Sequence, residues 1–180
     1  MQRSDPRTVY EGKHLAMRKQ GRWEYVTRKI AKPAVGVVAI TDMGNVVLVE
    51  QYRPPVSRRV IELPAGLSGD VAGAEQESLL AAAQRELLEE TGYVASRWTE
   101  LLTGFSSPGL TDESSTLFLA EGLSRVGSGG GDPTEDITVH EVPFGDVLAW
   151  IRRREAVVGH KLLAGLFAAC EKLEHEACRK

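Results

Sequence analysis

The chain has 180 residues, of which 42% are hydrophobic and 26% charged, a composition typical of one globular domain. Its net charge of −3 lacks the basic surplus that nucleic-acid-binding and membrane-surface proteins usually show, so neither kind of partner is expected. No apolar stretch approaches the roughly 20 residues of a membrane-spanning helix, and the first residues lack the apolar core of a signal peptide, which predicts a cytoplasmic protein.

Alternating segments and segments rich in Val and Ile predict β-strands. These segments cover residues 8–19, 22–31, 34–41, 45–52, 59–63, 97–104, 115–121 and 137–142. Turn signals at Gln20-Gly21 and Asp42-Met43-Gly44 join the first four segments into two hairpins.

Leucines and alanines at helical spacing predict a helix over residues 75–91, which ends at Gly92. Two more helices, over residues 144–154 and 158–175, close the chain. This order of elements predicts a mixed α/β or α+β fold with a sheet covered by helices. The glycine-rich run at residues 127–133 lacks the Lys-Ser/Thr pair and the following helix of a phosphate-binding loop, and a flexible surface loop is expected there.

Three carboxylates crowd the end of the first predicted helix: Glu86, Glu89 and Glu90. Residues three and four apart share a helix face, where like charges repel, and the helix dipole disfavours negative charge in the last turn. One interpretation is a solvated acidic face balanced by Arg85. The other is a site for Mg²⁺ or Mn²⁺, which prefer carboxylate oxygens and would offset the repulsion. Such ions usually support phosphoryl chemistry.

The end of this helix resembles the Nudix box, which reads Gly, five residues, Glu, seven residues, then Arg-Glu-apolar-any-Glu-Glu-any-Gly-apolar. The matching run is Arg85-Glu86-Leu87-Leu88-Glu89-Glu90-Thr91-Gly92-Tyr93, and seven residues separate it from Glu77, as the box requires. The box glycine would fall at Val71. We take Gly66, with ten residues between it and Glu77, as its equivalent, which implies a five-residue insertion in the loop before the helix.

Further segments resemble the Nudix enzymes that hydrolyse ADP-ribose. They are residues 50–55, residues 61–66, residues 107–113 and, within the last of these, Pro108, sixteen residues beyond Gly92. The resemblance implies that Arg53 contacts substrate, that the Ala65 carbonyl binds metal and that Glu113 is a catalytic carboxylate above the metal ions. Taken alone, the proline-containing segments would be ordinary turns.

Residues 1–32 resemble the N-terminal extension of the same subfamily, in which a Trp, a Glu and an Arg bind substrate. The equivalents here are Trp23, Glu24 and Arg28. A Trp face is suited to stack an adenine, although on an amphipathic strand Trp23 has an equal chance of lying in the core. In the subfamily the extension is exchanged between two subunits. The resemblance therefore implies a homodimer, with an exchanged β extension at 1–32 and a Nudix hydrolase domain at 33–180.

The implied architecture is the Nudix fold, an α/β (α+β) arrangement with a mixed sheet sandwiched between helices. The implied reaction is Mg²⁺-dependent hydrolysis of ADP-ribose to AMP and ribose 5-phosphate, with Mn²⁺ as a substitute ion. The expected metal ligands are Glu86 and Glu90, assisted by Glu89 and the Ala65 carbonyl. Glu62 is expected to help bind substrate, and Glu89 is a second candidate for the catalytic base.

Arg85 is expected to hold a helix carboxylate rather than substrate, and Glu77 to be structural. Two alternatives stay open. One is a hydrolase of another nucleoside diphosphate sugar, such as a GDP- or UDP-hexose. The other is a non-catalytic Nudix module that senses ADP-ribose-like ligands, which the intact metal glutamates argue against.

Overall fold

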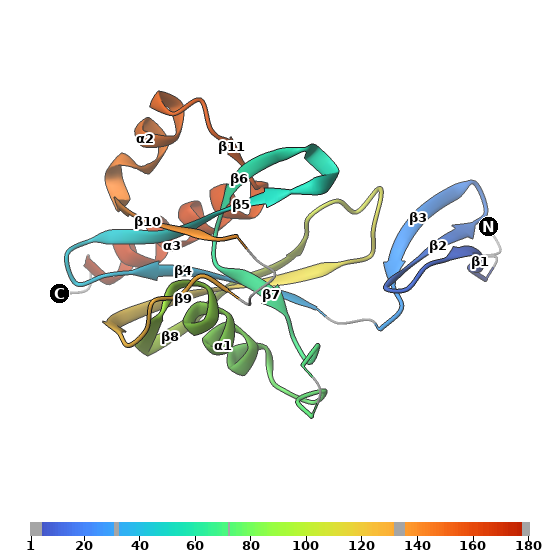
Figure 1. Cartoon of the computed structure of the whole chain (residues 1–180), viewed down its shortest axis with the longest axis horizontal. Helices are drawn as coiled ribbons and strands as arrows, with labels where there is room; N and C mark the ends of the chain where they lie inside the picture. Colours follow the sequence, from blue (N-terminus) through green and yellow to red (C-terminus); the bar gives the residue numbers. More distant parts are fainter. Residues whose placement is uncertain (1–4, 31–32, 72, 132–135, 178–180) are drawn as a thin grey trace.

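The computed structural model describes residues 5–30, 33–71, 73–131 and 136–177, which form two β-sheets and three α-helices (Figure 1). The strands are β1 Arg7–Glu11, β2 Leu15–Gln20, β3 Trp23–Arg28, β4 Ala34–Ile40, β5 Asn45–Arg53, β6 Arg58–Glu62, β7 Ala65–Leu67, β8 Tyr93–Phe105, β9 Ser114–Arg125, β10 Thr138–Pro143 and β11 Val157–Val158. The helices are α1 Leu79–Thr91, α2 Val147–Arg153 and α3 His160–Ala177, with 3-10 turns η1 Pro54–Val56 and η2 Phe144–Asp146. No helix in these ranges is long and apolar enough to cross a membrane.

The larger sheet has the strand order β11-β6-β5-β4-β9-β8, with β10 paired to β5 and β7 paired to β4. It is mixed, because β4 and β9 run parallel, as do β6 and β11, while the other pairs are antiparallel. Strand β4 is central and runs between β9 on one side and both β5 and β7 on the other. This branch brings the short β7 alongside the start of β4.

Helices cover both faces of this sheet, with α1 on one face and α3 on the other (Figure 1). The reason is the alternation of β4: Val35 and Val37 pack with α1 residues such as Leu87, whereas Val38 packs on the other face with Leu162 of α3. The expected mixed sheet between helices is therefore confirmed.

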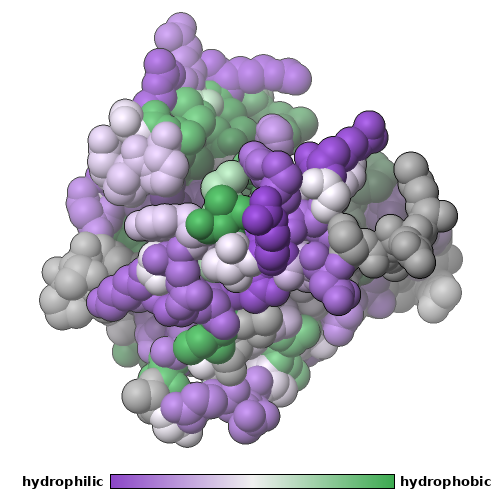
Figure 2. Space-filling model, turned by 90° about the vertical axis from the view of Figure 1, so that its right-hand side faces the viewer, coloured by the Kyte–Doolittle hydropathy of each residue, from purple (hydrophilic) through white to green (hydrophobic). Residues whose placement is uncertain are grey.

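A separate three-stranded sheet, β1-β2-β3, stands at one end of the molecule, and the tip of the β8–β9 hairpin points toward it (Figure 1). Most of the surface at this end is hydrophilic, and its hydrophobic residues lie in separate patches (Figure 2). Strand β3 touches the hairpin tip through a hydrogen bond of 2.8 Å from the Val26 amide to the Leu110 carbonyl. Thr111 also forms an isolated parallel bridge with Val26.

Several expected boundaries are wrong. The predicted strand 8–19 is two strands, because the chain turns at Gly12, whose amide bonds to the Leu15 carbonyl at 2.8 Å. The helix expected from residue 75 begins at Leu79, since the Ser78 side chain caps it by accepting a hydrogen bond from the Ala81 amide. The short strands β7 and β11 were not expected, and position 31, the end of a predicted strand, lies outside the described residues.

Candidate active site

Helix α1 points two of its three late carboxylates toward the sheet and one toward solvent. Glu86 and Glu90, one turn apart, are buried, with 8% and 3% of their surface exposed. The Glu89 side chain is 51% exposed. Glu86 and Glu89 share the Arg85 guanidinium, as neighbours on one side of the helix, so the three carboxylates differ in burial within the face that they share. Each residue turns the helix by about 100°, so that Glu89 and Glu90 project to opposite sides of Glu86, and only the side of Glu90 faces the sheet.

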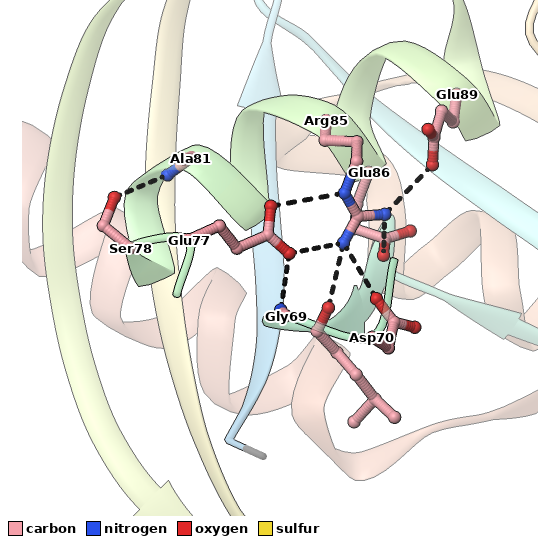
Figure 3. Close-up of polar contacts among 9 residues, drawn as sticks. Gly69, Asp70, Glu77, Ser78, Ala81, Arg85, Glu86 and Glu89 are labelled. Atoms are coloured by element: carbon pink, nitrogen blue, oxygen red, sulfur yellow. Dashed lines mark hydrogen bonds and ion pairs between the residues drawn. The ribbon is translucent and has the colours of Figure 1, made fainter. Parts of the chain in front are cut away.

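Arg85 is the centre of a network that joins α1 to the loop before it (Figure 3). Its guanidinium contacts Glu86 at 2.8 Å, the Leu67 carbonyl at 2.9 Å, Glu77 at 3.0 Å, Glu89 at 3.1 Å and Asp70 at 3.2 Å. Glu77 also accepts a hydrogen bond of 2.6 Å from the Gly69 amide. Arg85 thus holds helix carboxylates and Glu77 secures the inserted loop, as expected for both.

The buried carboxylates meet the backbone of β7. Glu90 Oε2 accepts a hydrogen bond of 3.0 Å from the Ala65 amide. A Cβ atom on Gly66 would lie 1.8 Å from Glu86 Oε1, so no other residue could stand there without displacing that carboxylate. This close approach supports Gly66 as the equivalent of the box glycine, and the insertion after it leaves the contact between β7 and α1 intact.

Burial changes the acidity of this site. It raises the pKa of Glu86 to about 7, an effect that the charge and hydrogen bond of Arg85 only partly offset. Burial alone would lower the pKa of the Arg85 guanidinium, but its hydrogen bond with Glu77 and its interactions with Glu86 and Glu89 raise it. Arg85 therefore stays charged, whereas burial disfavours the charged form of Glu86.

The oxygen atoms at this site fit a hard divalent cation. Within the described ranges, no three acidic, His or Cys side chains are close enough to hold an ion by themselves. Mg²⁺, however, binds through one or two carboxylates and completes its shell with waters and substrate phosphates. Glu86 and Glu90 supply such a partial set, beside the backbone of Ala65 and Gly66, where the missing glycine side chain admits the Glu86 carboxylate.

Two predicted residues of the N-terminal sheet, Trp23 and Arg28, lie at the β8–β9 hairpin of the same chain. Arg28 and Glu113 form an ion pair of 2.6 Å, and the Thr27 hydroxyl donates to Asp112 at 2.8 Å. Arg28 also lines a hollow of about 380 Å³ whose other wall includes Asp70 of the inserted loop. Arg28 therefore lies between the candidate base and the box loop.

Trp23 lies on the surface, 55% exposed, and lines a second hollow, of about 410 Å³. Tyr25, Phe105 and Pro108 also line this hollow, which makes it aromatic on both the N-terminal sheet and the hairpin side. Tyr25 and Phe105 were not expected at the site, because local sequence patterns do not reveal the contact between these two segments. The exposure of Trp23 excludes the alternative that it is a core residue of this chain.

The remaining predicted substrate residues are also held by ion pairs. Arg53 and Glu62 meet at 2.6 Å across the β5–β6 hairpin. Glu24 pairs with Lys19 at 3.0 Å on the exposed side of the N-terminal sheet. Asp70, a partner of Arg85, was missed, although its place in the insertion of the box was a usable signal.

The NUDIX domain model matches residues 31–162, about three quarters of the chain. The chain therefore belongs to the Nudix family of hydrolases, in agreement with the helix, the box glycine and the sheet described above. Nudix hydrolases generally use a divalent metal ion.

Two relatives indicate which Nudix enzymes this chain resembles, and one solved structure shares its fold. An ADP-ribose pyrophosphatase of Mycobacterium tuberculosis is 42% identical over 146 residues, which cover 79% of this chain and 68% of that protein. An ADP-ribose pyrophosphatase of Bacillus subtilis is 41% identical over 123 residues, which cover 68% of this chain and 64% of that protein. The crystal structure of an ADP compounds hydrolase superposes with a TM-score of 0.75 at 22% identity, covering 97% of this chain and 94% of that one, and shows the shared fold.

Proposed function

We propose that this chain hydrolyses the pyrophosphate of ADP-ribose to AMP and ribose 5-phosphate, using Mg²⁺. One structural observation carries the proposal: Glu86 and Glu90 converge, buried, on the backbone of Ala65 and Gly66. Two relatives at 41% and 42% identity are ADP-ribose pyrophosphatases, which supports the choice of substrate. A sensing module would have no need to keep costly buried carboxylates beside a box loop that is held in place by Arg85.

Glu86, Glu90 and the Ala65 carbonyl would hold the metal, with Glu89 assisting and with Mn²⁺ able to replace Mg²⁺. When bound, such ions neutralise phosphate oxygens and lower the pKa of a water molecule. Arg85 keeps Glu86 and Glu89 in place, because it bonds to both from the same helix. The Ala65 amide fixes the direction of the Glu90 carboxylate through its hydrogen bond of 3.0 Å.

Glu113 is the proposed general base. It accepts a proton from the attacking water while the water oxygen bonds to one phosphorus and the bond from that phosphorus to the bridging oxygen breaks. Arg28 orients this carboxylate at 2.6 Å, and its planar guanidinium has further donors for a phosphate oxygen. Glu89, half exposed on α1, is the second candidate for the base.

The two halves of the substrate would be held by the aromatic hollow and by arginines. Trp23, together with Tyr25 and Phe105, offers flat faces on which an adenine can stack. Glu24 on the same strand is the proposed partner of polar groups of the adenosine. Arg53, held by Glu62 at 2.6 Å, is the proposed contact to phosphate.

A panel of nucleotide sugars tests the proposal. The purified protein is incubated with ADP-ribose, ADP-glucose, GDP-mannose and UDP-glucose in the presence of Mg²⁺, and the products are separated by chromatography. AMP and ribose 5-phosphate from ADP-ribose, at the highest kcat/KM of the panel, is the expected result. A preference for a GDP- or UDP-hexose would mean that the same metal site acts on the alternative class of substrate. No turnover of any compound would favour the sensing module.

A homodimer that exchanges its N-terminal extension is part of the proposal. Its motivation is a small sheet with several exposed apolar side chains, namely Val9, Tyr10, Leu15 and Trp23. A three-stranded sheet of this kind gains stability when it packs on another surface, and exchange between identical chains is a low-cost way to provide one. The cytoplasmic location expected from the sequence stays a prediction.

Mixing two variants tests the exchange: Trp23→Ala, which is expected to raise KM, and Glu90→Gln, which is expected to nearly abolish turnover. Chains with Trp23→Ala and chains with Glu90→Gln are co-expressed and the heterodimer is purified. If sites are shared, one site carries both changes and the other carries neither, so about half of the wild-type activity returns. If each chain completes its own site, as the contacts of Arg28 with Glu113 allow, activity stays low. A monomer by light scattering would end the proposal of a dimer.

A further inference from the structure

The end of α1 is closed by the glycine-rich segment that follows β9. The Gly131 amide donates to the Glu89 carbonyl at 3.0 Å, and the Gly130 amide donates to the Glu90 carbonyl at 2.8 Å. The preceding carbonyl, that of Leu88, accepts from the Gly92 amide at 2.9 Å. The last carbonyls of a helix have no partner within the helix. Here two of them, on the two consecutive glutamates of the Nudix box, are satisfied by a segment about 40 residues further along the chain.

Glycine is required at the point of closest approach. A Cβ atom on Gly129 would lie 2.4 Å from the backbone carbon of Thr91 and 2.7 Å from the Glu90 carbonyl oxygen, and both are backbone atoms that cannot move aside cheaply. Gly129 also has a φ of 68°, in the region that side chains disfavour. Gly130 and Gly131 follow with φ of 111° and 77°. The three glycines therefore adopt a path, tight against α1, that other residues would not follow.

This contact complements the helix end with backbone N–H groups rather than with a further cation beside Arg85, which already bonds to Glu86 and Glu89. Helix α1, which lies wholly within the described residues, has no basic residue in its last turn. A Lys or Arg there would complement the helix dipole, but it would also pair with the carboxylates that a metal must reach. Backbone N–H groups complement the helix end and leave the side chains of Glu89 and Glu90 without an added cation.

We propose that residues 129–131, here called the glycine clamp, position the metal-binding end of α1, and that Gly129 is the positioning residue of this clamp. The inference rests on the proposed metal site, and it assigns a role to a segment that the proposed reaction does not use. The clamp holds the main chain of Glu89 and Glu90, so the Glu90 carboxylate meets the Ala65 amide at a fixed height along the helix. Its loss would weaken metal binding and slow turnover before it affected binding of the substrate's base.

Two alanine variants test the clamp in the full chain. Gly129→Ala places a methyl group against α1. Gly127→Ala is the matched control, because its Cβ would have only one neighbour within 4 Å, Gly92 Cα at 3.7 Å, and its φ is not in the positive range. Mn²⁺ affinity is measured without substrate by electron paramagnetic resonance. We expect the Kd of Gly129→Ala to rise about tenfold or more, as for other residues that support metal ligands, and that of Gly127→Ala to stay at the wild-type value.

Kinetics with ADP-ribose give the second readout. At saturating metal, Gly129→Ala should lower kcat and leave KM near the wild-type value, because the aromatic hollow lies at the tip of the β8–β9 hairpin and the clamp follows the opposite end of these strands. Equal Mn²⁺ affinity in both variants would overturn the clamp. Because Mn²⁺ affinity needs no turnover, this comparison decides the clamp even if the wild-type protein fails to hydrolyse ADP-ribose, which would count against the proposed function alone.

Hydrogen exchange of the wild-type protein covers the case in which Gly129→Ala does not fold. The amides of Gly130 and Gly131 should be protected, since both donate to carbonyls of α1. The amide of Ser128, for which no hydrogen bond is found among the described residues, is the internal reference. Exchange of the Gly130 and Gly131 amides as fast as that of Ser128 would overturn the proposal.

Discussion

Two charged networks on opposite sides of the larger sheet differ in how far their acidic and basic side chains balance, since Arg59 of the second network also pairs with Asp136 at 2.6 Å. In the first, one cation, Arg85, is surrounded by the carboxylates of Asp70, Glu77, Glu86 and Glu89. In the second, one carboxylate, Glu50, lies within 4.0 Å of three basic side chains, those of His140 at 2.8 Å, Arg59 at 3.3 Å and Arg154 at 3.9 Å. The first network has negative charge in excess, and the second does not.

The pKa values of Glu86 in the first network and Glu50 in the second shift in opposite directions. Burial raises the pKa of Glu86 to about 7 in spite of Arg85. Burial alone would also raise the pKa of Glu50, but the hydrogen bond and charge of His140, with the charges of Arg59 and Arg154, lower it. A network balanced within the protein stabilises the fold. A network with unbalanced carboxylates lowers stability unless a cation joins it, which agrees with the proposal that the Arg85 network lies at the metal site.

The largest expected effect is that of Glu90→Gln, which should nearly abolish turnover and leave the fold intact. A neutral amide keeps the shape of the side chain but holds Mg²⁺ poorly. Steady-state rates beside a thermal melt measure both effects, with the exposed Glu100→Gln as control. Addition of Mg²⁺ should raise the Tm of the wild-type protein but not that of Glu90→Gln. Near-wild-type activity at saturating Mg²⁺ would remove the distinction between the two networks.

Glu113 is a possible exception to this comparison, because it is held by an arginine, Arg28, as Glu50 is, and yet is proposed to be catalytic. If it is nevertheless the general base, Glu113→Gln should lower kcat by about 10²–10⁴-fold with a much smaller change in KM. Single-turnover rates at saturating Mg²⁺ provide the measurement. An unchanged kcat would assign the base to Glu89 instead, and an arginine-held carboxylate would then be structural in both places.

Arg85→Lys sharpens the comparison. An ammonium group cannot replace a planar guanidinium that reaches five oxygen partners, so we expect kcat to fall about 10–100-fold, as when other supports of metal ligands are lost. Arg59→Lys in the Glu50 network is the matched control, with an expected loss of Tm but no loss of kcat. Loss of activity in both variants would mean that the second network also serves the reaction.

The smallest expected effect is that of Glu50→Gln, which should leave kcat unchanged and lower stability. For a chain of this length, about 1 kcal/mol corresponds to a Tm lower by about 2–4 °C. Because the folded-state pKa of Glu50 lies below its ordinary value of 4.5, its contribution is present above pH 4.5 and is lost as the pH falls through the folded-state pKa. Thermal melts from pH 7 to pH 3 should therefore show the difference between wild type and variant shrinking toward zero.

The sequence predicts the parts of this molecule that depend on neighbours in the chain. The spacing from Arg85 to Gly92 gave the helix, its end and the three carboxylates. The boundary at Leu79 depends on a side-chain cap at Ser78, which competes with helical propensity upstream. Strand β7 has only three residues and exists because β4 pairs with it. The outward direction of Glu89 follows from which side of α1 meets the sheet, a property of the packed structure.

Long-range side-chain contacts were outside the reach of sequence patterns. The Glu50 network joins residues up to 104 positions apart, and no local motif connects Glu50 with His140 or Arg154. The glycine-rich run was expected to be a flexible surface loop. Residues 132 and 133 lie outside the described part of the chain, but residues 130 and 131 are half-buried and hydrogen-bonded to α1. Gly-rich composition shows which backbone angles are accessible, and only the fold shows what they are used for.

The two side-chain contacts between β3 and the β8–β9 hairpin have a consequence for how this protein can diverge. Thr27 bonds to Asp112, and Arg28 pairs with Glu113, across 85 residues of sequence. The NUDIX match begins at residue 31, after both partners on β3. If recombination replaced the segment before residue 31, the Nudix domain would be intact, but Asp112 and Glu113 would lose their partners Thr27 and Arg28. Positions 27 and 112, and positions 28 and 113, are expected to change in pairs among descendants, so that the unit of inheritance extends beyond the domain boundary.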